Sequence, residues 1–283
     1  MTSSLSAQTP LQDEIRKIVG DARGRVAVAC ALPGSNLNCN LEAHSRPPMQ
    51  SVFKLPLAVY VLHLVETGKF SLDQPIRFLP SDRILPETYS PLQDKYPNGD
   101  VDVPLRELLR LAASLSDNAA ADTLLRVAGG PADVDTYIKS LGVEGFHLED
   151  GEHALHRDAS AQYRNWFAPA GAVQLLRRLS DNSPLTAEHT ELLLGWMKDS
   201  PTGAHRLRAE LPAETIVMHK TGTSGVKDGV ASATNDIGMI TLPDGRRLAL
   251  AVFVTDSRAD EATREGVIAR VANAAYSAAL QVH

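Results

Sequence analysis

The sequence predicts an α+β fold in which an antiparallel sheet, built from both ends of the chain, is flanked by helices. Two observations indicate this class. Strand-type runs occur near the amino terminus and again after residue 212, whereas the segment between them has apolar residues at helical spacing. Strands from both ends can share one sheet only if those ends meet, so the helical middle must pack beside that sheet.

The amino-terminal part is predicted to contain one helix and two strands. Leu11–Val19 has helical spacing, and the strand-type runs Arg25–Leu32 and Leu37–Ala43 flank a Pro-Gly-Ser-Asn turn. Cys30 and Cys39 lie symmetrically about this turn, so on paired strands they could form a disulfide. Two free buried thiols fit the sequence equally well, and both states stay open.

The middle of the chain is predicted to be helical, and strands return after Pro212. Proline at the first turn and leucines at helical spacing are typical of amphipathic helices, and a Pro-Asp-Gly turn at residues 243–245 predicts a hairpin. The expected helices are Val52–Val65, Pro104–Leu115, Asn118–Val127, Pro131–Leu141, Pro169–Leu179, Thr186–Met197, Gly203–Glu210 and Asp260–Leu280, and the expected strands are Thr215–His219, Asp236–Leu242 and Arg247–Thr255.

These elements divide the chain into two lobes. We expect residues 1–47 and 212–283 to form an α/β lobe that contains the antiparallel sheet, and residues 48–211 to form an all-helical lobe. Ligand sites are often found where two such parts meet, so we expect the active site in the groove between the lobes.

Composition and charge argue against several classes of protein. Hydrophobic residues make up 43% and charged residues 22% of the chain, which excludes disordered and fibrous proteins. The net charge of -6 and the lack of long basic runs argue against a nucleic-acid partner. The apolar run Leu248–Val254 is among the longest and is far too short for a bilayer span, so we expect no membrane association. Residues 1–10 lack the features of a signal peptide.

The sequence also gives no reason to expect a metal or an organic cofactor. Two cysteines are too few for a four-cysteine zinc site. The nine histidines show no tight metal-ligand spacing with acidic partners. We therefore expect a protein whose chemistry depends on its own side chains.

The first candidate for that chemistry is Ser51-Val52-Phe53-Lys54, which places a hydroxyl and an amine one helical turn apart. A lysine that can take the proton of a nearby serine makes that serine a nucleophile. Pro56 is tolerated only near a helix amino terminus, where backbone N–H groups could stabilise an oxyanion. The spacing alone is weakly specific, because residues 224–227 repeat it.

Two later motifs carry polar groups at element boundaries. Ser116-Asp117-Asn118 follows an apolar helix, although its duplicate at residues 180–182 shows that plain helix capping gives the same pattern. Lys220-Thr221-Gly222-Thr223 occurs once, at the end of a strand-type run. A lysine and two hydroxyls on a strand edge suit an anionic carboxylate, and the glycine leaves room for a ligand beside the backbone.

The order of these three motifs resembles that of the penicillin-binding and class A serine β-lactamase families. Ser116 follows Ser51 by 65 residues and Lys220 follows Ser116 by 104, whereas Ser180 leaves only 40 residues before Lys220. The resemblance extends from the first hairpin to the last helix. It implies hydrolysis of the β-lactam ring of penicillins and cephalosporins through a serine acyl-enzyme, and hence antibiotic resistance.

The resemblance implies a second acidic group for a lactamase, which must activate the water that releases the product. Glu152 lies 17 residues before Pro169, a loop length that resembles that of class A enzymes. Its neighbours Glu149 and Asp150 fit a solvated loop better. We therefore expect Glu152 to be the deacylating base.

The chain departs from the family pattern around this loop. Two positions that usually hold asparagine are His156 and Asp122 here, and we expect these side chains to pair directly in place of an amide–amide contact. The usual arginine–aspartate salt bridge of the loop is lost, because its positions match Asp150 and Asn165. The loop is therefore expected to be held in another way.

Other features resemble the PER/VEB-type subgroup of extended-spectrum enzymes. They are Gln50 before the serine, His156 in the loop, Arg206 in a Thr-Gly-Ala-His-Arg stretch, and the segment of residues 219–235. The part between residues 223 and 236 is longer than in common class A members. The resemblance thus implies a site that is open to bulky cephalosporins.

The same resemblance assigns a role to each candidate residue. Ser51 attacks the lactam carbonyl, with the backbone N–H groups of Ser51 and Thr223 as oxyanion hole, and either Lys54 or Glu152 through a water takes the serine proton. Ser116 is expected to pass a proton to the lactam nitrogen, Asn118 to hold the acyl amide, Tyr89 to wall the entrance, and Lys220, Thr221, Thr223 and Arg206 to receive the substrate carboxylate.

Three alternatives compete with this interpretation. A penicillin-binding transpeptidase or carboxypeptidase would use the same serine, with Glu152 as an ordinary loop residue. A β-lactam sensor would acylate and hold its ligand as a signal. A folded α/β protein without serine chemistry would require three ordered motifs to be accidental. For a lactamase, we expect a monomer that binds a small β-lactam, located in the periplasm or secreted as the family usually is.

Overall fold

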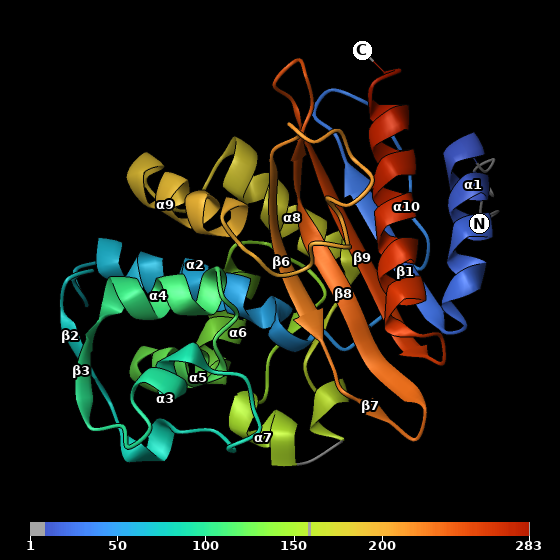
Figure 1. Ribbon diagram of the computed structural model, residues 1–283. Helices are drawn as coiled ribbons and strands as arrows, with labels where there is room; N and C mark the ends of the chain where they lie inside the picture. The colour runs from blue at the N-terminus through green and yellow to red at the C-terminus, as the bar shows by residue number, and fades with distance from the viewer. Residues whose placement is uncertain (1–8, 158–159, 283) are drawn as a thin grey trace, which may run out of the picture.

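The computed structural model describes residues 9–157 and 160–282 and has the expected α+β architecture (Figure 1). A five-stranded sheet with antiparallel pairing combines one strand from the amino-terminal part with strands that follow residue 216. The strand order is β1-β9-β8-β6, and β7 pairs with β8. Both ends of the chain therefore build one sheet. Its strands are β1 (Arg25–Ala31), β6 (Val217–Thr223), β7 (Val226–Lys227), β8 (Val230–Thr241) and β9 (Arg247–Ser257).

The sheet is covered on both faces because apolar residues fill both sides of its central strands. Even-numbered residues of β9, from Leu248 to Val254, belong to the core beneath helix α10, whereas Ala249 to Phe253 at odd positions belong to the core shared with the helical middle. Figure 1 shows α1 beside α10 on one side of the sheet. Helix α8 lies against β1 and β9, so part of the predicted helical lobe also packs on the sheet. The covering helices are α1 (Pro10–Val19), α8 (Pro169–Asp181) and α10 (Glu261–Ala279).

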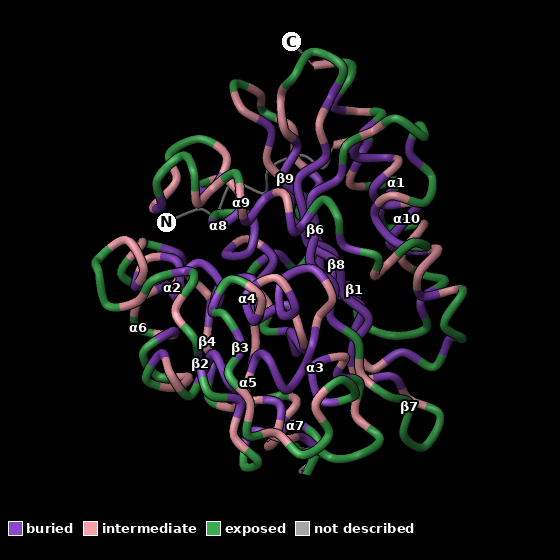
Figure 2. The backbone as a smooth tube through the Cα atoms, turned by 60° about the vertical axis from the view of Figure 1, so that its left-hand side comes forward, coloured by how far each residue is buried: buried purple, intermediate pink, exposed green. Residues whose placement is uncertain are grey.

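Helix α2 (Lys54–Glu66) is central to the helical part. Its residues from Lys54 to Val59 are all buried, as expected for a helix that is apolar on every side. Figure 2 shows buried residues through α2 and the sheet strands, and exposed residues at outer turns such as the one after β7. The helices in contact with α2 are α4 (Leu105–Ala113), α5 (Asn118–Ala128), α6 (Pro131–Ser140) and α9 (Ala187–Lys198). The predicted boundaries at residues 47/48 and 211/212 stay a prediction.

Several short elements were not predicted. They contain two to six residues, too few to show a period along the sequence. One of them, α7, carries a candidate functional residue. These elements are β2 (Pro75–Phe78) paired with β3 (Val101–Pro104), β4 (Phe146–His147) paired with β5 (Trp166–Phe167), the helix α3 (Pro91–Lys95), and the slightly longer α7 (Glu152–Arg157).

Two predicted elements are wrong. Residues 203–210 form turns instead of a helix, beginning at Gly203, whose φ of 65° lies in the left-handed region. Leu37–Ala43 is not a strand, because only Leu41 bridges to Val28 in the described chain. The Asn38 side chain accepts a hydrogen bond from the backbone of Asn40 instead, and such local bonds compete with strand pairing.

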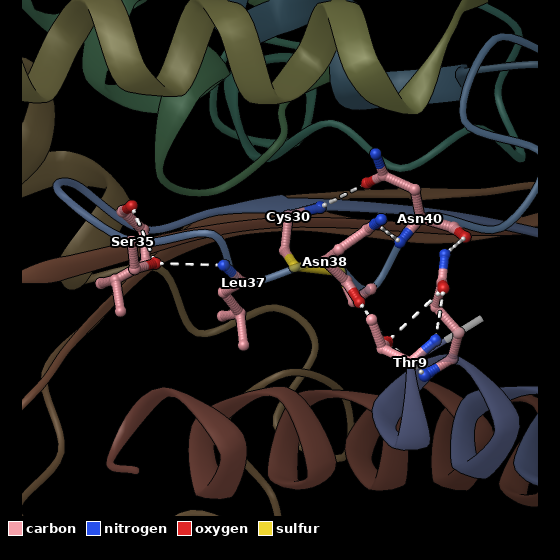
Figure 3. Close-up of a disulfide and its surroundings, with 9 residues drawn as sticks. Thr9, Cys30, Ser35, Leu37, Asn38 and Asn40 are labelled. Carbon is pink, nitrogen blue, oxygen red and sulfur yellow. Dashed lines mark hydrogen bonds between the residues drawn. A yellow bond between two sulfur atoms is a disulfide. The ribbon is translucent and has the colours of Figure 1, made fainter. Parts of the chain in front are cut away.

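Cys30 and Cys39 form a disulfide (Figure 3), so the alternative of two free thiols is excluded. Their Cα atoms are 5.7 Å apart. The surrounding polar contacts hold the same segment, since Asn40 Oδ1 accepts from the backbone N–H of Cys30 and Thr9 Oγ1 donates to the carbonyl of Asn38. The segment after β1 is therefore tied both to the sheet edge and to the start of α1.

The packing of α10 gives a testable prediction. Ile268 is fully buried between α10 and the sheet, so Ile268→Ala leaves a cavity and should lower the free energy of unfolding by about 2–5 kcal/mol. Leu280, 42% exposed at the end of the same helix, is the control, and Leu280→Ala should stay within about 0.5 kcal/mol of the parent. Chemical denaturation measures both. Equal losses would mean that α10 does not pack as described.

Candidate active site

The predicted serine–lysine pair forms where a short 3-10 helix runs directly into α2. The 3-10 helix η2 (Gln50–Phe53) ends at Phe53, so Ser51 lies one turn before Lys54. Lys54 Nζ donates a hydrogen bond of 2.9 Å to Ser51 Oγ. A hydroxyl held against an amine in this way is a candidate nucleophile, and this amine can accept its proton once it has passed on one of its own.

Lys54 is completely buried and is satisfied by oxygens from three other segments. Its Nζ donates to the carbonyl of Ser116 at 2.8 Å and to the side-chain oxygen of Asn118, and it forms an ion pair of 2.8 Å with Glu152 Oε1. A buried ammonium is costly unless it is paired and hydrogen-bonded. The amine therefore fixes the positions of all the groups around it.

Glu152 is the first residue of α7 and is 3% exposed. The hydroxyl of Ser51 donates to its Oε1 at 3.4 Å. Burial alone would raise the pKa of Glu152, but the charge of Lys54 and hydrogen bonds from His156 and Lys54 outweigh it and hold this pKa at about 2. Glu152 is therefore a carboxylate at physiological pH and is able to accept a proton.

Asp122 holds α7 by its backbone. Its two carboxylate oxygens accept from the N–H groups of Glu152 at 2.7 Å and His153 at 2.9 Å, which are otherwise unpaired donors at a helix start. Burial, and then the nearby Glu152 carboxylate, raise the pKa of Asp122. The expected direct pair with His156 does not form between these described residues, because His156 Nε2 lies 3.4 Å from Glu152 Oε2 instead.

The rest of the loop is held by an amide in place of the family's salt bridge. Buried Asn165 accepts from the backbone N–H groups of Glu149 and Asp150 at 2.8 and 2.9 Å and donates to the carbonyl of Asp150. Arg164 adds an ion pair of 2.7 Å with the Asp150 carboxylate. The loop is thus closed across its base, as the loss of the usual salt bridge required.

The Ser116-Asp117-Asn118 motif forms the turn between α4 and α5. Asp117 is the N-cap of α5 and is fully buried, accepting from Ala120 N, Ser90 Oγ and Leu92 N. Ser116 has a positive φ of 60° in this turn. The motif is therefore a helix cap, and the same cap fixes the backbone that carries the Ser116 hydroxyl.

Lys220 on β6 reaches that hydroxyl. Its Nζ donates to Ser116 Oγ at 2.8 Å, which joins the second and third motifs across 104 residues. Burial, followed by the charge of Lys54, lowers the pKa of Lys220 well below its usual range. The ammonium of Lys220 therefore gives up its proton more readily than an exposed lysine does.

Gly222 lets β6 lie directly against the segment that carries Ser51. A Cβ added at Gly222 would be 2.4 Å from the carbonyl oxygen of Met49, so no larger residue fits without movement. The amide of Asn235 on β8 donates to the carbonyl of Pro48 at 2.8 Å and holds the same contact from the next strand. The strand edge and the nucleophile are therefore neighbours.

Arg206 and two threonines complete the polar surface near this strand edge. Arg206 donates to Thr223 Oγ1 at 2.8 Å and is paired with Glu265 on α10 at 2.9 Å. Thr221 Oγ1 donates to Thr202 Oγ1 at 2.8 Å. Thr202 and Glu265 were not predicted. Thr202 is the first residue of the Thr-Gly-Ala-His-Arg stretch that contains Arg206. Nothing in the sequence marks Glu265, which lies 59 residues after Arg206.

The structure thus brings most of the predicted residues together, and Tyr89 stands at the edge. Tyr89 is 55% exposed, and it is linked to the site through the next residue, Ser90, which donates to Asp117.

In residues 9–157 and 160–282, no group of three His, Cys, Asp or Glu side chains could hold a metal ion. The arrangement offers an activated hydroxyl, a second proton donor and several cations, as acyl transfer to an anionic substrate requires.

Comparison with known proteins places this arrangement in a family. A family model described as "Beta-lactamase enzyme family" matches residues 10–279. The chain is 41% identical to the extended-spectrum β-lactamase PER-1 of Pseudomonas aeruginosa, over 96% of this chain and 88% of that protein. It is 35% identical to the β-lactamase VEB-1 of Pseudomonas aeruginosa, over 91% and 85%.

A solved structure agrees with these matches. The crystal structure of a β-lactamase from Chitinophaga pinensis superposes with a TM-score of 0.92 and 42% identity, covering 96% of this chain and all of that one. Likeness of this extent, over nearly the whole length and with the three motifs gathered at one place, shows that the chain belongs to the class A serine β-lactamase family, is PER/VEB-like within it, and hydrolyses β-lactams.

Proposed function

We propose that Ser51 is the nucleophile of this hydrolysis. The observation that carries the proposal is the position of its Oγ, 2.9 Å from Lys54 Nζ and 3.4 Å from Glu152 Oε1. Ser51 Oγ attacks the lactam carbonyl carbon, the carbon–nitrogen bond of the ring breaks, and an ester to Ser51 remains. The backbone N–H groups of Ser51 and Thr223 stabilise the oxyanion that develops.

Two routes can remove the proton of Ser51. Lys54 is able to accept it only after passing a proton of its own to Glu152, 2.8 Å away. Alternatively, Glu152 accepts the proton of Ser51 by way of a bridging water, without Lys54. The low pKa of Glu152, where burial is outweighed by the charge of Lys54, keeps the carboxylate ionised for either route.

The other residues serve the leaving group and the substrate carboxylate. Ser116 gives its proton to the lactam nitrogen, and Lys220, 2.8 Å from its oxygen, replaces that proton. Asn118 holds the amide of the acyl group, and Tyr89 walls the entrance. The groups that receive the substrate carboxylate are Lys220, Thr221, Thr223 and Arg206.

Glu152 then activates the water that releases the product, so Glu152→Ala should acylate and stall. We expect its turnover to fall by at least ~10²-fold, the usual contribution of a general base, while intact mass shows a stable adduct of one substrate per chain. Ser51→Ala is the control and should form no adduct. The assay is a chromogenic cephalosporin followed by absorbance and by mass spectrometry together.

The same experiment separates the competing functions. Many turnovers by the parent protein are expected of a β-lactamase. One adduct without turnover would favour a penicillin-binding protein or a sensor. Complete, rapid turnover by Glu152→Ala would assign the deacylating base to another residue.

Asp122 is proposed to support the loop through the α7 backbone. Asp122→Ala removes both acceptors for Glu152 N and His153 N, so it should displace Glu152, slow deacylation roughly tenfold and lower the thermal midpoint. Asp122→Asn keeps one acceptor and should lie between. Asp94→Ala, on the exposed side of α3, is the control. Steady-state kinetics and thermal unfolding test this, and unchanged values in Asp122→Ala would contradict it.

We also propose that bulky cephalosporins are substrates. PER-1 is named an extended-spectrum enzyme, and in this chain Val226 on β7 is 62% exposed. Residues 225–228 line one side of a pocket of about 380 Å³, and Gln162 and Tyr163 line the other. Gln162 accepts a hydrogen bond from Gln50, the residue before Ser51. One residue that lines the pocket therefore contacts the residue that precedes the nucleophile.

Shortening residues 225–229 tests this proposal. We expect kcat/KM for an oxyimino-cephalosporin to fall by at least about tenfold, because the substituent loses its pocket, while benzylpenicillin is turned over as before. Steady-state kinetics on the two substrates give the ratio. An equal loss for both, or no oxyimino-cephalosporin turnover by the parent, would count against an extended spectrum.

We propose a monomer that acts on a small β-lactam without nucleic acid, in the periplasm or outside the cell, as its family resemblance and net charge of -6 support. Within residues 9–157 and 160–282, no helix has the length and apolar character needed to cross a membrane. Light scattering on the purified protein tests the oligomeric state.

A further inference from the structure

A fully buried histidine lies directly beside the residues assigned to the substrate carboxylate. His219 precedes Lys220 on β6, and both His219 and its neighbour Asp236 on β8 are 0% exposed. His219 Nδ1 lies 2.8 and 2.9 Å from the two oxygens of Asp236. The proposed reaction uses neither side chain, although both side chains are completely buried where they meet.

The contacts of His219 define where its proton is. Arg208 Nη2 lies 2.9 Å from His219 Nε2, and a guanidinium nitrogen can only donate. Nε2 must therefore accept, which leaves the ring proton on Nδ1, where it is donated to Asp236. The imidazole is neutral and is held from both sides, by a carboxylate and by a guanidinium.

These contacts hold the turn that carries Arg206. The backbone N–H of Leu207 donates to Asp236 Oδ2 at 3.3 Å, and Leu207 lies between Arg206 and Arg208. The turn also packs closely on β6, because a Cβ at Gly203 would lie 2.5 Å from the Thr221 side chain and 3.3 Å from Cε1 of the imidazole. His219 and Asp236 thus contact the turn on both sides of Arg206: at Gly203 before it, and at Leu207 and Arg208 after it.

We propose that His219, with Asp236, is a positioning residue for binding of the substrate carboxylate. Its neutral imidazole joins β6, which carries Lys220, to the turn that carries Arg206. The distance between the ammonium of Lys220 and the guanidinium of Arg206 is thereby fixed. The inference rests on the proposed role of Arg206 and Lys220. It extends that role to a side chain that does not touch substrate.

A proton added to Nε2 would break this arrangement. It would place an imidazolium against the guanidinium of Arg208, with the Asp236 carboxylate as the compensating charge from β8. Arg208 and Lys198, at the end of α9, both line a surface pocket of about 340 Å³, and the carbonyl of Lys198 is a second acceptor for Arg208 Nη2 at 3.5 Å. Loss of the Arg208 contact frees the end of the turn that follows Arg206 and leaves the Arg206 guanidinium held only by its own contacts to Glu265, Thr223 and the backbone carbonyl of Asn235. Acid should therefore weaken substrate binding.

The test compares the pH profile of the parent with that of His219→Asn. Asparagine can still donate to Asp236 from near the Nδ1 position, but it offers Arg208 no acceptor at Nε2 and cannot take a proton. We expect KM to rise about tenfold at neutral pH, with kcat nearly unchanged, since one charge-assisted contact is lost. The rise of KM on the acid side, present in the parent, should be absent. His205→Asn, at an exposed histidine of the same turn, is the matched control and should keep the parent profile.

Arg208→Gln provides an independent arm. Removing the guanidinium removes the donor to His219 Nε2 and so unties the turn from β6, and KM should rise as it does in His219→Asn, with kcat nearly unchanged. Nitrogen NMR of the histidine ring should show the proton on Nδ1 at neutral pH. Glu152, whose pKa is about 2, does not titrate in this range, and an acid-side change that came from Asp122, whose pKa is raised by burial, would persist in His219→Asn.

Each outcome decides the inference separately from the proposed function. A parent that turns over substrate, with the same acid limb in His219→Asn, overturns the positioning role. So does an Nε2-bound proton at neutral pH, or a His219→Asn variant that loses only thermal stability. Failure of the parent to form an adduct at Ser51 would instead contradict the proposed function. If His219→Asn does not fold, Arg208→Gln and the NMR spectrum still decide.

Discussion

The buried ammonium of Lys54 is the constraint on which the site depends. It has no access to water, so the chain itself must supply every acceptor, and it does so with a hydroxyl, a carbonyl, an amide oxygen and a carboxylate. These acceptors belong to η2, the α4–α5 turn, α5 and α7. Moving any one of them away would leave a buried charge underpaired, which costs several kcal/mol. The buried charge of Lys54 therefore holds these chemical groups in place, and the elements that carry them pack around it.

The supporting contacts use backbone groups more than side-chain pairs. Asp117 and Asp122 both bind N–H groups at helix starts, and Asn165 closes the loop by binding two N–H groups and a carbonyl. A carboxylate or amide that satisfies two backbone donors fixes the path of the chain, whatever side chains follow. This explains how the loop keeps Glu152 in place although the family's usual salt bridge is missing.

Long periodic elements and motif spacing were predictable from the sequence, and contacts between distant segments were not. α2 is recognisable as an apolar segment of helix length, α5, α10 and the large strands are long enough to show a pattern, and each of the three motifs carries its chemistry in a few adjacent residues. The strand expected at residues 37–43 failed because asparagines there bond their own backbone. The helix expected at residues 203–210 failed because Gly203 starts a turn. Glu265 and the Asp122 contact to backbone could not be foreseen, since both depend on how α10 and α7 dock.

The pairing of β1 with β9 has a consequence for how the protein is made. Arg25 is opposite Thr255, so apart from the bridge between Val28 and Leu41 the edge strand has nothing to pair with until β9 has left the ribosome. Pairs so far apart in sequence are slow to form, and until they do, one apolar side of β1 stays uncovered. Much of the helical part can gather around α2 earlier, but β6 reaches Ser51 only near the end. Activity should thus appear as one of the last events of folding, with the nascent chain exposed to aggregation until then.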